Sequence, residues 1–154
     1  MKEEFNYPLL YILMRTDLES MNPGKAVAQG VHAGHQFVHE VEILRNKIGG
    51  SGVGGKPEDV FPNKYNIISM YDSWSTRTGD GFGTTICLSV DDDTLHRVVA
   101  AGKTMRLFSN ITHDPSYPLR DGSVTHFIPL DTCGFVFGEK EDLSILLGQF
   151  SLMP

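Results

Sequence analysis

Residues 7–44 read YPLLYILMRTDLESMNPGKAVAQGVHAGHQFVHEVEIL, and the change of pattern within this stretch decides the fold. The first part, Tyr7 to Arg15, is a continuous apolar run of strand length that ends in polar Thr16 and Asp17, which is typical of a buried central strand. From Lys25 to about Leu44 the apolar residues follow helical spacing instead. The stretch therefore predicts a buried strand followed by a long helix.

Local signals place the start of that helix. Asn22 is the natural N-cap, and Pro23 occupies the first helical position, where its missing N–H costs nothing. The spacing predicts an apolar side that faces the core and is formed by Val27, Val31, Gly34, Val38 and Val41.

Four hydrogen-bonding side chains fall within an arc of roughly 60 degrees on the opposite side of the helix. They are Lys25, Gln29, His32 and Gln36. A polar face toward solvent is the ordinary interpretation of such a stripe. Lys25, however, lies in the first turn, where the helix dipole disfavours a cation and the free N–H groups attract anions. A bound phosphate or oxyanion would relieve that conflict, so the stripe is a candidate binding surface.

The rest of the chain alternates strand and helix patterns. The expected strands are 84–90, 107–112 and 124–130, with a short edge strand at 134–138, and the expected helices run from the acidic residues 91–93 to about 106 and over 141–149. The segment HDPSYPLRDGS, residues 113–123, indicates a structured turn because it holds two prolines and a glycine. These patterns predict one α/β domain over 1–154, a three-layer α/β/α sandwich around a small, roughly four-stranded mixed sheet.

A long glycine-rich loop is expected at about 46–83, where the regular signal fails. It is interpreted either as a functional flap or as a loop that holds a short helix. Within it, GSGVGGK at 50–56 has the glycine and lysine spacing of a phosphate-binding loop, but Pro57 replaces the required hydroxyl residue, so a flexible loop is the favoured interpretation.

Composition excludes several classes of protein. The chain has 154 residues, 40% of them hydrophobic, and 13 basic against 19 acidic residues give a net charge of -6. This excludes disordered, collagen-like and coiled-coil proteins and argues against nonspecific coating of nucleic acid or membrane. Cys87 and Cys133 are too few for a disulfide scaffold, and the apolar run 7–14 is too short to cross a bilayer, so we expect a cytoplasmic protein in a reducing compartment.

Two residues in the second half have side chains suited to chemistry. Asp114 ends an expected strand and enters the Pro-rich turn, a rim position from which scaffolds project functional carboxylates, although Asp-Pro also opens ordinary turns. Thr125 lies early on the next expected strand and could direct its hydroxyl to the same cleft. Two further patterns are weaker indications of a site. His35 and His39 stand one helical turn apart and could share a metal ion, but the sequence offers no third ligand. Cys133 and His126 could form a nucleophilic pair, but they fall on opposite faces of an unbroken strand.

The segment MRTDLESMNPGKAVAQGVHAGHQF, residues 14–37, resembles the signature of the archaeal and eukaryotic type of peptidyl-tRNA hydrolase (type 2). The matching pieces are Arg15-Thr16-Asp17-Leu18, Gly24-Lys25, Ala28-Gln29 and His32-Ala33. In the second half, Ile111-Thr112-His113-Asp114 and the segment from Ser123-Val124-Thr125 to Pro129 match more loosely, and His113-Asp114-Pro115-Ser116 stands where the family has a QDAG-like turn. The resemblance covers about two-thirds of the chain.

The resemblance implies an enzyme that uses water, without metal or cofactor, to hydrolyse the ester between a peptide, or an N-blocked amino acid, and the 3′ end of tRNA. It implies Lys25, Asp114 and Thr125 as catalytic residues in one cleft. Asp114 would be the base or orient the water, Lys25 would stabilise the carboxylate, the oxyanion or a nearby phosphate, and Thr125 would be a positioning donor.

The resemblance also implies substrate-binding residues and leaves alternatives open. Gln29, His32 and Arg15 are expected to bind substrate in the same cleft. Because the chain is acidic, tRNA binding would require local clustering of cations, with Tyr71 or Trp74 available for base stacking; the cations concerned are Arg15, Lys25, Lys47, Lys56, Lys64, Arg77 and Arg120. A noncatalytic RNA- or protein-binding module on the same fold, hydrolysis of another small ester or amide, and a homodimer all stay open.

Overall fold

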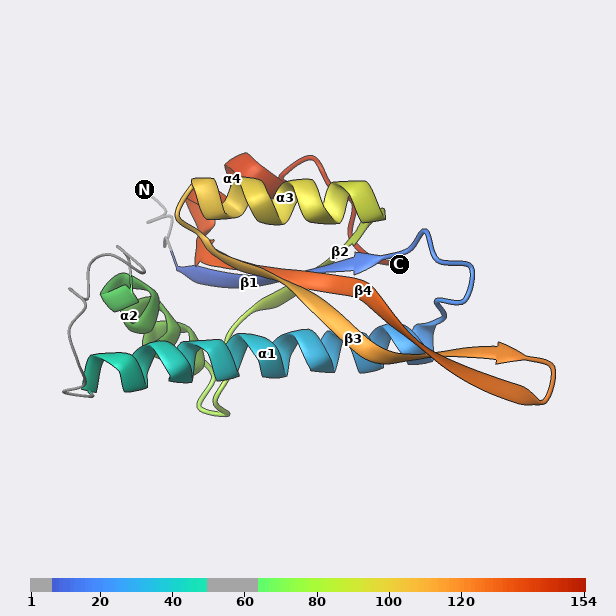
Figure 1. Cartoon of the computed structure of the whole chain (residues 1–154). Coiled ribbons are helices and arrows are strands. Elements are labelled where there is room, and N and C mark those ends of the chain that lie inside the picture. The colour runs from blue at the N-terminus through green and yellow to red at the C-terminus, as the bar shows by residue number, and fades with distance from the viewer. Residues whose placement is uncertain (1–6, 50–63) are drawn as a thin grey trace.

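The computed structural model describes residues 7–49 and 64–154 and has eight elements. In chain order they are β1 (Pro8–Arg15), α1 (Pro23–Gly49), α2 (Lys64–Ser75), β2 (Thr85–Val90), α3 (Asp92–Thr104), β3 (Phe108–Asp121), β4 (Val124–Glu139) and α4 (Lys140–Leu147). The strands form one mixed sheet in the order β2-β1-β4-β3, in which only the β1–β2 pair is parallel. Helices α1 and α2 cover one face and α3 and α4 the other (Figure 1), which confirms the expected three-layer sandwich.

The continuous apolar run of β1 is explained by its central position. Its side chains alternate between two cores: Leu10 and Ile12 pack beneath α1, whereas Leu9 and Leu13 pack beneath α3. A strand that is buried on both faces has no polar side, so the alternation typical of a half-exposed strand is lost. β1 therefore separates the two cores and contributes to both.

Phe37 of α1 is the centre of the core on the α1 side. Its ring centroid lies 4.8 Å from that of Phe137 and 5.5 Å from that of Phe135, both on β4. Trp74 of α2 packs edge-on against the same ring at 5.5 Å and donates its indole N–H to the Thr84 carbonyl at 3.0 Å. The aromatic cluster thus fixes both helices of this layer on the sheet.

Helix α1 begins where the sequence predicts. The Asn22 side-chain oxygen accepts a hydrogen bond from the Lys25 backbone N–H at 2.9 Å, which is an N-cap contact. The expected core-facing side is confirmed at Val38 and Val41, which pack in the core, but was wrong for Val27 and Val31, which are 70% and 50% exposed. The residues that α1 buries are Ala26, Gln29, Ala33, Phe37, Val41 and Leu44. Alanines allow the helix to approach the sheet closely, and Gln29 is buried because it is hydrogen bonded there.

Part of the expected 46–83 loop is helical. Helix α2 occupies 64–75, so the interpretation as a loop that contains a short helix is confirmed for this part. The phosphate-loop-like segment 50–56 lies outside the described residues.

The expected turn at 113–123 was wrong, because this segment continues β3 and pairs with β4 as far as Asp121 and Val124. The two strands form a long hairpin that extends past the N-terminal end of α1 (Figure 1). Pro115 is accommodated because β3 is at the edge of the sheet and the pairing shifts register between Asp114 and Tyr117. The turn itself is confined to Gly122 and Ser123, and Gly122 has a φ of 58°.

The segment 134–138 was expected at an edge but lies inside β4, paired with β1 on one side and β3 on the other. Gly134 is required there, because a Cβ would lie 2.8 Å from the Asn110 carbonyl oxygen. At the other edge of the sheet, the segment after α4 pairs with β2. Ser89 donates its N–H to the Ser151 carbonyl at 3.1 Å, and Met153 donates to the Cys87 carbonyl at 3.0 Å. Over the described ranges, no helix has the length and apolarity needed to cross a bilayer.

Replacing Phe37 with alanine should lower the free energy of unfolding by about 3–5 kcal/mol, because it removes the central ring of a fully buried cluster. Urea denaturation followed by circular dichroism measures the effect. Val27→Ala on the exposed side of the same helix is the matched control and should change stability by less than about 0.5 kcal/mol. A larger loss at Val27 than at Phe37 would contradict the orientation of α1.

Candidate functional site

The side-chain amide of Gln29 joins α1 to both strands of the hairpin. Its Nε2 donates to Asp114 Oδ2 of β3 at 2.7 Å, and its Oε1 accepts from Thr132 Oγ1 of β4 at 2.5 Å. All three residues are buried, with Asp114 the most exposed at 9%. A buried amide is tolerated when its donors and acceptor are paired, so these contacts fix the position of Asp114 relative to α1.

A β-bulge aims Thr132 at this amide. Thr112 pairs with Cys133, but the next residue of β3, His113, pairs with Asp131, so Thr132 is an extra residue on β4. A bulge interrupts the alternation of a strand and re-aims the side chain at that point. Thr132 therefore points to the α1 layer together with Cys133, whose thiol donates to the Gln29 carbonyl at 3.3 Å.

The carboxylate of Asp114 accepts two hydrogen bonds, one at each oxygen. Oδ2 accepts from the Gln29 side-chain amide, and Oδ1 accepts from the backbone N–H of Ser116 at 2.9 Å. Thr112 lies two residues earlier on the same face, and its buried hydroxyl has no hydrogen-bond partner. The site therefore combines a fixed carboxylate with a buried hydroxyl that faces the Cys133 thiol.

Lys25 lies one helical turn before Gln29 and reaches the same strand as Asp114. Its ammonium donates to the Pro118 carbonyl at 2.6 Å and lies 5.0 Å from the centre of the Tyr117 ring. The Tyr117 hydroxyl is 3.0 Å from the Ser20 hydroxyl, which holds the ring in place. Among the ion pairs of the described residues there is none between Lys25 and Asp114. The two side chains thus share one stretch of β3 without direct contact.

Thr125 does not meet Asp114, so the expected convergence was wrong for this pair. Thr125 is exposed and pairs with Arg120 near the end of the hairpin. It lies five positions along β4 from Leu130, the partner of Asp114, which corresponds to about 17 Å. The cause is the extended conformation of 113–121, which carries Thr125 away, whereas a compact turn would bring it back.

The expected substrate-binding residues occupy different places. Gln29 is at the centre of the site, and His32 is exposed on α1 one turn further along. Arg15 is buried and engages residues on the α3 side of the sheet. Arg15 and Arg77 do not cluster, because Arg77 lies over the Tyr7 ring before β1 whereas Arg15 ends that strand; Arg120 lies on β3, two residues after the Pro118 carbonyl that Lys25 contacts. Lys56 lies outside the described residues, and Trp74 is buried in the core instead of being available for stacking.

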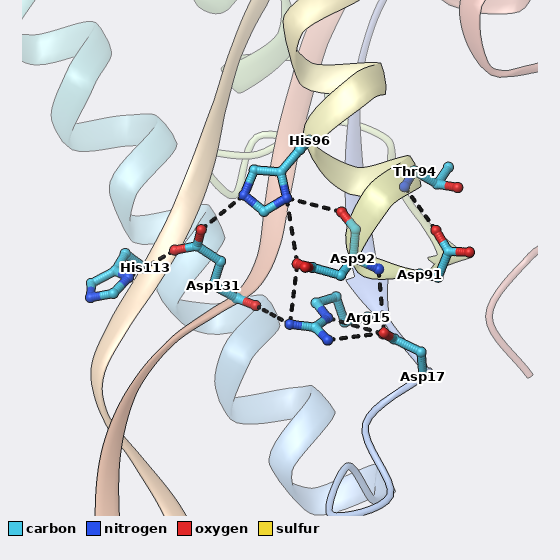
Figure 2. A network of polar contacts seen from close by, with 8 residues as sticks. All are labelled: Arg15, Asp17, Asp91, Asp92, Thr94, His96, His113 and Asp131. Atoms are coloured by element: carbon cyan, nitrogen blue, oxygen red, sulfur yellow. Dashed lines mark hydrogen bonds and ion pairs between the residues drawn. The ribbon is translucent and has the colours of Figure 1, made fainter.

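A second polar cluster lies on the α3 face of the sheet (Figure 2). Asp131 accepts from His113 Nδ1 at 2.7 Å through one oxygen and contacts His96 Nε2 at 2.9 Å through the other. His96 Nδ1 lies 2.9 Å from the backbone carbonyl of Asp92. Because both ring nitrogens of His96 face acceptors, the hydrogen bond to Asp92 and then that to Asp131 raise its pKa above the usual value.

Arg15 connects this second cluster to the end of β1. It binds the Asp17 carboxylate through two hydrogen bonds of 3.0 and 2.9 Å and lies 3.2 Å from Asp92 Oδ1. The hydrogen bond to Asp17 raises the pKa of Arg15, and the same contact lowers the pKa of Asp17. Arg15 also donates to the backbone carbonyl of Asp131 at 3.1 Å. The guanidinium is therefore committed to internal partners.

Cys133 is not suited to nucleophilic catalysis. Burial raises the pKa of its thiol to about 11, although the hydroxyls of Thr132 and Thr112 act in the opposite direction. The thiol is thus protonated at neutral pH, whereas the nucleophile would have to be the thiolate. Over the described parts of the chain, no group of three or more potential ligands is arranged to hold a metal ion.

Sequence reasoning missed Thr132 and Asp131. A signal for them exists, because these two polar residues interrupt the otherwise apolar run from Ile128 to Phe137. Neither protein-family models nor curated proteins give a match to this chain in sequence comparisons.

Replacing Thr132 with valine should lower the free energy of unfolding by about 1–3 kcal/mol, because the shape is kept but the buried Gln29 oxygen loses its donor. Thr125→Val, on the exposed end of the hairpin, is the matched control and should be close to neutral. Chemical denaturation of both variants provides the comparison. Equal effects at the two threonines would refute the central position of Thr132.

The Asp131 cluster should make stability depend on pH in two ranges. Burial opposes ionisation of Asp131, but hydrogen bonds from His113 and His96 outweigh it and lower its pKa, so this contribution is lost as pH falls below about 4. The pKa of His96 is raised, so its contribution is complete below about pH 6.5 and is lost as pH rises through the raised value. Asp131→Asn should therefore destabilise more at pH 5.5 than at pH 8.5, by less than about 1 kcal/mol because both side chains are partly exposed. Thermal melts at the two pH values measure the difference, and a pH-independent difference would contradict it.

Proposed function

We propose that this protein is a peptidyl-tRNA hydrolase that acts in the cytoplasm and cleaves the ester between a peptide, or an N-blocked amino acid, and the 3′ end of tRNA. The observation that carries the proposal is the 2.7 Å hydrogen bond between Gln29 and Asp114. It joins the two segments that carry the resemblance to this family across 85 residues of sequence. Of the residues that the family likeness assigns to one site, Gln29 and Asp114 are in contact, and Lys25 contacts the strand that carries Asp114.

Ester hydrolysis needs a group that orients water and accepts its proton. Asp114 suits this role because its carboxylate has about four lone-pair directions and uses two of them on Gln29 and Ser116. The carboxylate is thereby held in one orientation and keeps the capacity to accept a hydrogen bond from water.

The negative charge that develops on the ester oxygen requires a donor or a cation. Lys25 is the cation of the site, and its ammonium has three N–H groups, of which one is used on the Pro118 carbonyl. Its position in the first turn of α1 adds the positive end of the helix dipole, which favours an oxyanion or a phosphate of the acceptor end. No metal or cofactor takes part in this scheme.

Thr132 replaces Thr125 as the threonine of the site. Its hydroxyl donates to Gln29, so it orients the amide that holds Asp114 and acts as a positioning residue. His32 is kept as a substrate-binding candidate, because it is exposed one turn after Gln29. Because the net charge is -6, the surface as a whole does not attract tRNA. Attraction would come from individual groups at the site such as Lys25.

Asp114→Asn should reduce turnover of N-acetyl-aminoacyl-tRNA by roughly 100-fold to 10,000-fold, because it removes the proton acceptor while keeping the shape of the side chain. Lys25→Met should reduce it by roughly 100-fold or more through loss of the cation. Release of free tRNA, followed on acid gels in the presence of a chelator, measures both effects. Lys103→Met, on the last turn of α3, is the control for loss of a lysine and should retain full activity.

Turnover close to that of the parent chain in the folded Asp114→Asn variant would refute the scheme. Tight binding of the tRNA by the parent chain without turnover would instead favour a noncatalytic RNA-binding module. If uncharged tRNA fails to compete while a small ester is cleaved, the substrate would be a different small ester.

A further inference from the structure

The position of Arg15 is incompatible with direct contact to a substrate on the α1 face. The residue is 8% exposed, and its guanidinium is engaged by Asp17, by Asp92 and by the backbone of Asp131 on the other side of the sheet (Figure 2). A buried cation of this kind is costly unless every N–H direction has a partner. The arrangement therefore calls for a function within the protein.

The contact with Asp131 lies at the point where the β-bulge leaves the regular ladder. Pairing between β1 and β4 ends at Met14 and Cys133, so the β4 backbone before Cys133 is not paired with β1. At that point the Arg15 side chain, instead of a backbone N–H of β1, donates a hydrogen bond to the Asp131 carbonyl at 3.1 Å. The Asp131 side chain is held from the other directions by His113 of β3 and His96 of α3.

The restraint on Asp131 is transmitted to the α1 face through one residue. Thr132 follows Asp131 directly and is the bulge residue. Its hydroxyl donates a hydrogen bond to Gln29 Oε1 at 2.5 Å, and Gln29 Nε2 donates one to Asp114 Oδ2 at 2.7 Å. An unbroken series of short contacts thus runs from the α3 face to the carboxylate on the α1 face. A bulge re-aims a side chain and interrupts the ladder of hydrogen bonds at that point, so the direction of the Thr132 side chain depends on the position of the bulge.

We propose that Arg15 is a positioning residue for the reaction, which locks the β-bulge at Thr132 and thereby holds Gln29 and Asp114 in the geometry that activates water. The expected effect on kcat rests on the proposed function, whereas the expected effect on the positions of Thr132 and Gln29 does not. The fork of the guanidinium is essential, because two N–H groups grip Asp17 while Nη1 reaches the Asp131 carbonyl. A lysine at this position would keep the charge and lose the simultaneous contacts.

The test compares Arg15→Lys and Arg15→Met with Arg45→Met in the full chain. Arg45 is the matched control, because it also pairs with an aspartate, Asp72, but lies between α1 and α2 away from the bulge. Both Arg15 variants should lower kcat on N-acetyl-aminoacyl-tRNA about tenfold to hundredfold with KM within about twofold, as expected when reacting groups are misplaced without loss of binding contacts. Arg45→Met should leave kcat and KM unchanged.

A second readout does not depend on activity. In NMR spectra, the side-chain NH2 signals of Gln29 and the backbone signal of Thr132 should shift and exchange faster with solvent in both Arg15 variants and stay unchanged in Arg45→Met. If Arg15→Met fails to fold, Asp17→Asn, which weakens the grip on the guanidinium while keeping Arg15, should give the same shifts at reduced size.

A rise in KM with unchanged kcat would overturn the inference and return Arg15 to substrate binding. Unperturbed Gln29 and Thr132 signals in folded Arg15 variants would overturn it as well, as would full activity of Arg15→Lys. If the parent chain shows no hydrolysis but the NMR shifts appear, the proposed function fails while the structural role of Arg15 is supported.

Discussion

The buried amide of Gln29 is the contact on which the arrangement of the α1 layer depends. A glutamine in a core is unfavourable unless its oxygen and nitrogen both find partners, and Thr132 and Asp114 provide them from two different strands. Gln29 faces the sheet together with Ala26 and Phe37, whereas Val27 and Val31 are exposed. Hydrogen bonding thus allows a polar residue to lie on the side of the helix that packs on the sheet.

The polar residues at the end of the sheet divide between its faces because side chains alternate along strands. On β3, His113 and Asp114 are neighbours in sequence but belong to opposite layers, and on β4 the same holds for Asp131 and Thr132. The α1 face thus has the carboxylate with free acceptor capacity, whereas the ionic groups of the α3 face satisfy one another. Two clusters that would repel or neutralise each other in one cleft are kept apart by a single layer of backbone.

Local signals in the sequence were sufficient for some elements and insufficient for others. The N-cap contact of Asn22 and the apolar run of β1 depend on nearby residues, so both could be predicted. The extended conformation of 113–121 could not, because Pro115 is compatible with a strand only at a sheet edge, and the position of a strand in the sheet is a long-range property. The same limit explains why Thr132 was missed, since the position of the bulge, which decides that Thr132 faces Gln29, depends on how β3 pairs with β4.

The two edges of the sheet, along β2 and along β3, are blocked in different ways, and this has a consequence for self-association. An open strand edge offers unpaired N–H and carbonyl groups on which another chain can add a strand, and fibrillar aggregation begins in this manner. Along β2 the segment 151–153 occupies the positions at Cys87 and Ser89 that an incoming strand would use, and along β3 Pro115 and Pro118 remove two donors while the register shifts bend the strand. The sheet is thereby protected against growth in either direction even though it is not closed into a barrel.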